Sequence, residues 1–214
     1  MLIIIGLHKA GVPSHEGLEG LVGICIAHTA HLLSTFVLFS LTRAVFPGHK
    51  ANRFALITGV LHIISPAGLF LSAPYAESSC ALLTFSGYLL FVKSFNSDGD
   101  TTASHDLLVL ISGVLFGIAT TFRSNGLLNG LAFLQEALQR LVELKSGRRS
   151  STARRLLATG LGGMSIAAGF LLPQYIAYME YCAQPASSLL RPWCQRSLPS
   201  IYTFVQEHYW CVLN

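Results

Sequence analysis

Two charged residues lie where long apolar stretches would normally exclude them. Glu77 follows the apolar string 54–71, and Arg123 ends the apolar string 107–122. A charge among so much hydrocarbon is costly unless it pairs, faces water or lies at a membrane surface. A carboxylate can act as a base or bind hydroxyl groups, and a guanidinium can hold two phosphate oxygens at once. The pair therefore predicts a polar site.

Neighbouring residues extend this candidate site. Tyr75 precedes Glu77 in a short turn, and Ser124 and Asn125 directly follow Arg123. Glu77 could act as a base, bind a hydroxyl-bearing substrate or pair with Arg123, whose guanidinium suits a phosphate. An alternative remains open for each charged residue. Glu77 could be an interfacial anchor at a helix start, and Arg123 could simply extend its side chain to the membrane surface.

Composition indicates what must position these residues. Of 214 residues, 52% are hydrophobic and only 11% are charged. Such a charge-poor chain is typical of integral membrane proteins, so we predict an all-α, polytopic transmembrane bundle. The net charge of +4 does not indicate nucleic-acid binding, because the basic residues lie in loops between apolar segments. We therefore expect no nucleic acid among the partners.

We predict about six membrane spans in a single domain, residues 1–214. The 23 residues from 20 to 42 contain no Asp, Glu, Lys or Arg, enough for a helix across about 30 Å of hydrocarbon. The predicted spans are Gly20–Leu41, Phe54–Leu71, Ser78–Val92, Leu107–Phe122, Ser124–Val142 and Leu156–Tyr178. We expect Pro173 to kink its span. Pro66 could kink its span or free a backbone carbonyl that binds a ligand, a water or a neighbouring helix. In the amphipathic fifth span, Glu136 and Arg140 have the i,i+4 spacing that favours a helix.

Basic residues predict the orientation of these spans. Loops 42–53, 93–106 and 143–155, together with Arg140, hold ten of the fourteen Lys and Arg residues. Basic loops normally face the cytosol, so the loop 143–155 is predicted to be cytosolic. The lead-in 1–19 and the tail 180–214 are then lumenal, on the side of Glu77 and Arg123. The string 145–155 could alternatively bind anionic lipids.

Other reactive residue types offer weaker signals. His28 and His31 share a helix face, but two imidazoles are too few for a metal site, so we interpret them as helix-packing contacts and expect no metal. Cys25 and Cys80 are expected to be buried free thiols. Cys182 and Cys194 could form a disulfide in a lumenal tail. The small residues Gly160, Gly162, Gly163, Ala167, Ala168 and Gly169 predict close helix packing.

Three sequence blocks resemble a known family. ISPAGLFLSAPYAESSCALLTFSGYLL (64–90), GIATTFRSNGLLNG (117–130) and RPWCQRSLPSIYTFVQEHYW (191–210) resemble the PIG-V type, the GPI mannosyltransferase 2 family of the GT-C class. The likeness covers roughly residues 20–210. It implies a multi-pass endoplasmic-reticulum enzyme without a cofactor, which moves mannose in α-1,6 linkage from dolichyl-phosphate mannose to a GPI glycolipid. By the same resemblance, Arg123 is expected to neutralise a phosphate with Ser124 and Asn125 as hydrogen-bond donors, and Tyr75 and Glu77 to orient acceptor or donor. Membrane lipids and a small membrane subunit are expected partners.

The resemblance also implies departures. Family members are about twice as long and carry a lumenal Trp-Asp pair whose aspartate is the expected base, whereas residues 1–19 contain neither Trp nor Asp. We therefore expect a fragment that is inactive alone, with its catalytic base unidentified. The rival hypothesis is a small multi-spanning transporter or a non-catalytic assembly subunit. That hypothesis predicts charged residues at mid-depth in several spans, whereas here they gather at span ends.

Overall fold

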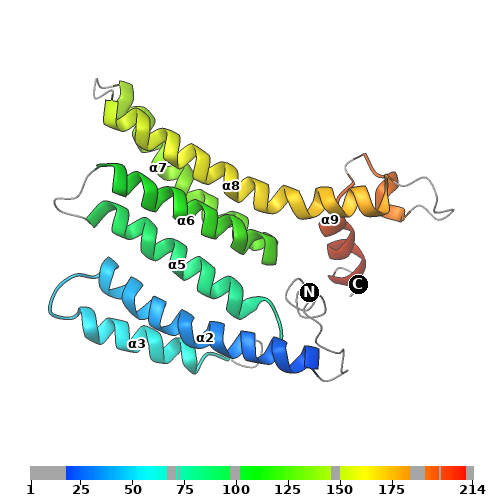
Figure 1. Ribbon diagram of the computed structural model, residues 1–214, viewed down its shortest axis with the longest axis horizontal. Coiled ribbons are helices and arrows are strands. Elements are labelled where there is room, and N and C mark those ends of the chain that lie inside the picture. The colour runs from blue at the N-terminus through cyan, green and yellow to red at the C-terminus, as the bar shows by residue number, and fades with distance from the viewer. Residues whose placement is uncertain are drawn as a thin grey trace.

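The computed structural model describes residues 18–66, 71, 73–96, 102–145, 150–183, 191–197 and 199–210. The predicted lead-in 1–19 lies outside this part of the chain except for its last two residues. The described residues form helices and turns and include no strand, which confirms the all-α prediction (Figure 1). The main helices are α2 (Leu18–Val45), α3 (Ala51–Ile63), α5 (Glu77–Asn96), α6 (Thr102–Phe122), α7 (Gly130–Lys145) and α8 (Ser150–Tyr181).

The helices run alternately up and down along one axis (Figure 1). α3 packs on α2, α2 on α5, α5 on α6 and α6 on α8, while α7 packs beside α8. We call the end where α5 begins and α6 stops the Glu77 end, on the right of Figure 1. The end where α6 and α8 begin is the Arg155 end. Charged residues that are distant in sequence thus meet at the two ends of one bundle.

Within the described residues, four helices are long and apolar enough to cross a membrane. They are α2, α5, α6 and α8, and each contains and extends one predicted span. A long run of uncharged, mostly apolar residues accounts for the length of each helix. A bilayer would cover the apolar side chains that these helices expose. The chain therefore has the architecture of a membrane-spanning helical bundle.

The second predicted span differs in the structure. α3 stops at Ile63 and Ile64 caps it, so a continuous helix over 54–71 is wrong. Its 13 residues rise about 20 Å, less than the hydrocarbon thickness. The physical reason is Pro66, because a residue that precedes proline is pushed out of the α conformation. Pro66 therefore follows the helix and does not kink it.

The fifth predicted span is also interrupted. Residues 124–142 do not form one helix: the 3-10 helix η1 (Ser124–Asn129) comes first and α7 follows. The turn is tight because Gly126 lies against the backbone of Thr120, where a Cβ would clash. Together η1 and α7 bring the chain back from the Glu77 end to the Arg155 end (Figure 1). α8 instead continues through Pro173 without ending.

The core lies between α5, α6, α7 and α8. Phe116, Phe133, Ile166 and Val109 are almost fully buried. Phe116 contacts Phe133 edge-on, with ring centroids 5.9 Å apart. This aromatic cluster fills the centre, while the bundle's outer surface keeps large apolar side chains exposed.

Glycines let α6 and α8 approach closely. A Cβ on Gly113 would meet the backbone of Gly162, and one on Gly117 would lie 2.5 Å from the carbonyl oxygen of Ser165. Gly169 contacts Gly117 in the same way. The close-packing prediction is thus confirmed for Gly162 and Gly169. It is wrong for Gly160 and Gly163, where an added Cβ would have no neighbouring atom within 4 Å, and for Ala167 and Ala168, which are exposed.

Candidate functional site

Glu77 and Arg123 meet at the Glu77 end of the bundle. Arg123 Nη1 donates a hydrogen bond to Glu77 Oε1 at 2.5 Å. The side chains of Arg123 and Glu77 are 43% and 31% exposed, respectively, so the ion pair is open to solvent or headgroups. The predicted proximity of these two residues is confirmed. Their predicted role in substrate binding stays a prediction.

Helix ends explain how the two charges reach each other. Glu77 begins α5, where the helix dipole favours a carboxylate. Arg123 follows α6 with extended backbone (φ −143°, ψ 127°), and its N–H still bonds to the Ala119 carbonyl at 3.1 Å. Gly126 then donates to the Arg123 carbonyl at 2.8 Å. These bonds fix the backbone of the arginine, while its side chain extends toward α5.

The other predicted site residues lie on the same two segments. Ser124 is half-buried and Asn125 is exposed, both at the start of η1. Tyr75 is 59% exposed in the turn before α5. The structure therefore places all five predicted residues at one end of the bundle, and the ion pair joins two of them directly.

An apolar groove adjoins the ion pair. It lies between α2, α5 and α6 with a volume of about 550 Å³. Its lining includes Thr29, Leu83, Ser79 and Phe122. Phe122 and Ser79 stand one and two residues from Arg123 and Glu77, so one end of the groove lies near the charged pair. An ion pair beside an apolar groove can bind an amphiphile, with the polar headgroup at the ion pair and the apolar part in the groove.

Cys25 also lines this groove. The prediction that it is a buried thiol is wrong, because it is exposed on α2, whereas Cys80 is half-buried and also free. The pairing that the sequence left open is present in the tail: Cys182 and Cys194 form a disulfide across 12 residues.

The two histidines of the first helix differ. The His31 ring contacts His62 of α3 with centroids 4.8 Å apart, and His62 Nε2 lies 3.0 Å from Ser34 Oγ. His31 is thus the expected helix-packing contact, while His28 is exposed. Among the described residues, no three His, Cys, Asp or Glu side chains gather as metal ligands.

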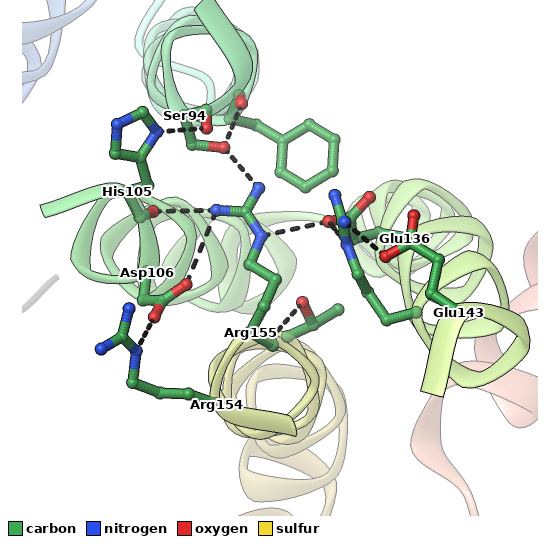
Figure 2. Close-up of polar contacts among 10 residues, drawn as sticks. Ser94, His105, Asp106, Glu136, Glu143, Arg154 and Arg155 are labelled. Atoms are coloured by element: carbon green, nitrogen blue, oxygen red, sulfur yellow. Dashed lines mark hydrogen bonds and ion pairs between the residues drawn. The ribbon is translucent and has the colours of Figure 1, made fainter. Parts of the chain in front are cut away.

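Sequence reasoning missed a buried charged cluster at the Arg155 end (Figure 2). Arg155 Nε donates to Glu136 Oε1 at 3.0 Å, and the two side chains are only 8% and 2% exposed. Arg155 also donates to Ser94 Oγ at 2.8 Å and to the His105 carbonyl at 3.1 Å. Its guanidinium lies 5.0 Å from the Phe95 ring centroid. One side chain of α8 therefore joins α5, α6 and α7.

More charges surround this centre. Arg140 donates to Glu136 at 2.9 Å, as its i,i+4 spacing predicted, and to Glu143 at 2.8 Å. Arg154 pairs with Asp106 at 2.5 Å. The labelled side chains of Figure 2 point toward one another from four helices. Three arginines thus face three carboxylates, so the cluster is neutral and satisfied. It fits a structural clamp, not a ligand site.

The part of the basic string 145–155 that the structure describes is helical. Ser150 to Arg155 belong to α8, and both arginines of this part have acidic partners. The Arg155–Glu136 pair could not be predicted from the string, because its partners lie 19 residues apart and no pattern in the string marks Glu136. The sidedness inferred from the loops stays a prediction.

Comparison with known proteins gives a consistent result. Residues 16–213 match the family Mannosyltransferase (PIG-V). The chain is 47% identical to GPI mannosyltransferase 2 of Chaetomium globosum over 98% of this chain and 49% of that protein. It is 42% identical to GPI mannosyltransferase 2 of Gibberella zeae over 94% of this chain and 46% of that protein.

A more distant relative is GPI mannosyltransferase 2 of Yarrowia lipolytica, 33% identical over 88% of this chain and 45% of that protein. The chain spans about half the length of the curated relatives it matches. No solved structure shows a significant match. The apolar helices and these relatives make the chain a membrane protein. With the family match covering nearly its whole length, the chain belongs to the Mannosyltransferase (PIG-V) family.

Proposed function

We propose that this chain is part of a mannosyltransferase of GPI-anchor assembly in the endoplasmic-reticulum membrane. The complete enzyme transfers the second mannose, in α-1,6 linkage, from dolichyl-phosphate mannose to the GPI precursor on the lumenal side. The observation that carries the proposal is the Arg123–Glu77 pair beside an apolar groove, in a chain of this family. The reaction needs no cofactor, since the lipid-linked donor is a substrate.

The chemistry assigns roles to this site. In an inverting displacement, the acceptor hydroxyl oxygen attacks the mannose anomeric carbon while the bond to the phosphate oxygen breaks. Dolichyl phosphate leaves with the electron pair, and a base takes the hydroxyl proton. Arg123 neutralises the charge that develops on the leaving phosphate. The hydrogen bond to Glu77 uses only Nη1 of Arg123. A guanidinium has five N–H donors, so donors remain for the phosphate.

The groove and the neighbouring polar residues complete the proposal. The apolar wall between α2, α5 and α6 holds a lipid tail, while Ser124 and Asn125 donate hydrogen bonds to the phosphate. Glu77 holds the arginine in place before the donor binds, and Tyr75 orients a substrate. The catalytic base is not among these residues. A small membrane subunit is a further proposed partner.

The test uses a chimera in which this chain replaces the matching half of the Chaetomium globosum relative. The chimera is expressed in fungal cells depleted of their own enzyme, and microsomes are supplied with labelled dolichyl-phosphate mannose. Arg123→Ala should reduce labelled GPI precursor by at least about 100-fold, the usual cost of losing a donor that stabilises transition-state charge. Arg123→Lys should restore part of the activity, since a point charge remains.

Arg154→Ala is the matched control, because it removes an exposed arginine at the opposite end of the bundle. It should leave transfer within about twofold of the parent chimera. Unchanged transfer in both Arg123→Ala and Glu77→Ala would refute the assignment of this site.

A further inference from the structure

The C-terminal segment folds back onto the last long helix. The Cys182–Cys194 disulfide ties the segment to the end of α8. Beyond it, α9 (Ile201–Val205) returns along α8, and Tyr202 stacks on Phe170 with ring centroids 5.7 Å apart. Figure 1 shows α9 beside the Glu77 end of α8. A covalent link and an aromatic contact therefore hold this segment in one position.

A pocket with several hydrogen-bonding groups lies between α8 and this returning segment. Its volume is about 620 Å³, within the range of small-molecule sites. Its lining carries an amide, a guanidinium and three hydroxyl groups beside two apolar side chains: Gln174, Arg196, Ser197, Ser200 and Thr203, with Phe170 and Pro199. These hydrogen-bonding groups contrast with the apolar groove beside Glu77 and Arg123. The pocket thus suits a ligand that combines hydrogen-bonding groups with apolar faces, as a sugar ring does.

Hydrogen bonds organise the pocket wall. Ser200 Oγ donates to Gln174 Oε1 at 2.7 Å, so the amide oxygen is committed. The Gln174 amide nitrogen has a long contact of 3.5 Å with the Phe170 carbonyl, which leaves it weakly held. Because the hydrogen bond from Ser200 fixes the Gln174 amide group, the N–H donors of that group are held in position to bind a ligand oxygen.

The charge of the pocket is balanced. Arg196 donates to Glu207 Oε2 at 2.6 Å. The Arg196 charge is thus compensated by Glu207, as the Arg123 charge is by Glu77. A neutral polyol needs no free charge in the wall, and its hydroxyl groups both donate and accept. The amide and hydroxyl groups of the wall can therefore bind a sugar.

The pocket also lies at the depth of the ion pair. α6 and α8 run in parallel in contact, with Gly117 against Gly169. Arg123 follows Gly117 by six residues and Gln174 follows Gly169 by five, which correspond to rises of about 9 Å and 8 Å. The two polar sites therefore face the same end of neighbouring helices.

We propose that the pocket of Gln174, Arg196 and Ser200 binds the neutral sugar part of the acceptor glycolipid. The proposal rests on the proposed function, in which Arg123 takes the phosphate of the donor. The acceptor must then lie to one side at the same depth, and the pocket on α8 is where sugar-binding groups gather. Gln174 binds the sugar directly in this arrangement.

The test measures saccharide binding by the whole chain in lipid nanodiscs. Methyl α-mannopyranoside is titrated and binding is followed by saturation-transfer NMR. Gln174→Ala should weaken binding by about three- to tenfold, the effect of losing one hydrogen bond. Gln174→Glu should weaken it as well, because it keeps the acceptor for Ser200 but removes the amide donor. Gln139→Ala, an exposed glutamine of α7, is the matched control and should bind as the parent does.

Three results would overturn the proposal: no saturable binding, binding by both Gln174 variants as tight as that of the parent chain, or displacement of the sugar by equimolar inorganic phosphate. These outcomes are independent of the transfer assay with the chimera. Loss of the Arg123 effect there, with Gln174-dependent sugar binding intact, would refute the proposed transfer site alone. A normal Arg123 effect with sugar binding insensitive to Gln174 would refute the sugar pocket alone.

Discussion

Removing the Arg155 guanidinium should destabilise the bundle strongly. Arg155→Met keeps much of the side-chain stem but deletes the donors to Glu136, Ser94 and the His105 carbonyl. Glu136 is 2% exposed and would retain only Arg140 as a partner. Breaking a buried pair by removing one partner costs about 3–5 kcal/mol. Because Arg140 still compensates part of the Glu136 charge, we expect a loss of about 2–4 kcal/mol in the free energy of unfolding.

The adjacent arginine supplies a matched control. Arg154 carries the same charge on the same helix turn, but its side chain is 47% exposed and pairs with Asp106 alone. Arg154→Met should therefore cost about 0–1 kcal/mol, as exposed ion pairs do. Both variants are unfolded by denaturant titration in the same detergent micelles, and helix content is followed by circular dichroism.

A double variant tests the reason for the difference. If the cost comes from an uncompensated buried carboxylate, Arg155→Met combined with Glu136→Leu should be no less stable than Arg155→Met alone. Equal destabilisation by Arg154→Met and Arg155→Met would refute the reasoning. So would a double variant in which the two losses simply add.

Three further outcomes follow from the structure. Gly117→Ala should lower the free energy of unfolding by about 1–3 kcal/mol, because the added Cβ meets the Ser165 carbonyl. Gly160→Ala should cause no such loss, since no atom lies within 4 Å of its added Cβ. Equal losses in the two variants would contradict the close contact at Gly117. An engineered glycosylation acceptor at Asn125 should be modified in microsomes, and the absence of glycan there would contradict lumenal placement. The hydrogen bond from Arg196 lowers the pKa of Glu207, so its contribution to holding the tail is present above the ordinary glutamate pKa and is lost as pH falls through the lowered value. The protection factor of amides 201–205, which corrects for the intrinsic pH dependence of exchange, should therefore fall only at pH values below the ordinary glutamate pKa, and a fall near neutral pH would contradict this assignment.

Much of the fold could be predicted from residue order. The uncharged runs of α2, α5, α6 and α8 were sufficient, because a run of about 20 apolar residues has few stable alternatives to a membrane helix. Helix ends were less predictable. α3 stops before Pro66 and η1 interrupts the fifth segment, and both breaks depend on local backbone geometry that hydropathy does not record.

The candidate site was predictable for the same reason. Glu77 and Arg123 stand out in the sequence because hydrocarbon flanks them, and up-and-down helices of similar length bring the start of α5 beside the end of α6. Their direct hydrogen bond could not be predicted, since it depends on the rotamers of two long side chains.

The sequence by itself determined the class of protein, the apolar helices and the residues whose charge is costly in a membrane. Only the tertiary structure decided which charges compensate each other. Arg155 looks like one more basic residue in a loop, yet the packing of four helices buries it against Glu136. Likewise, the polar pocket exists only because the tail returns along α8. Hydropathy is a property of neighbours in sequence, whereas compensation of charge is a property of neighbours in space.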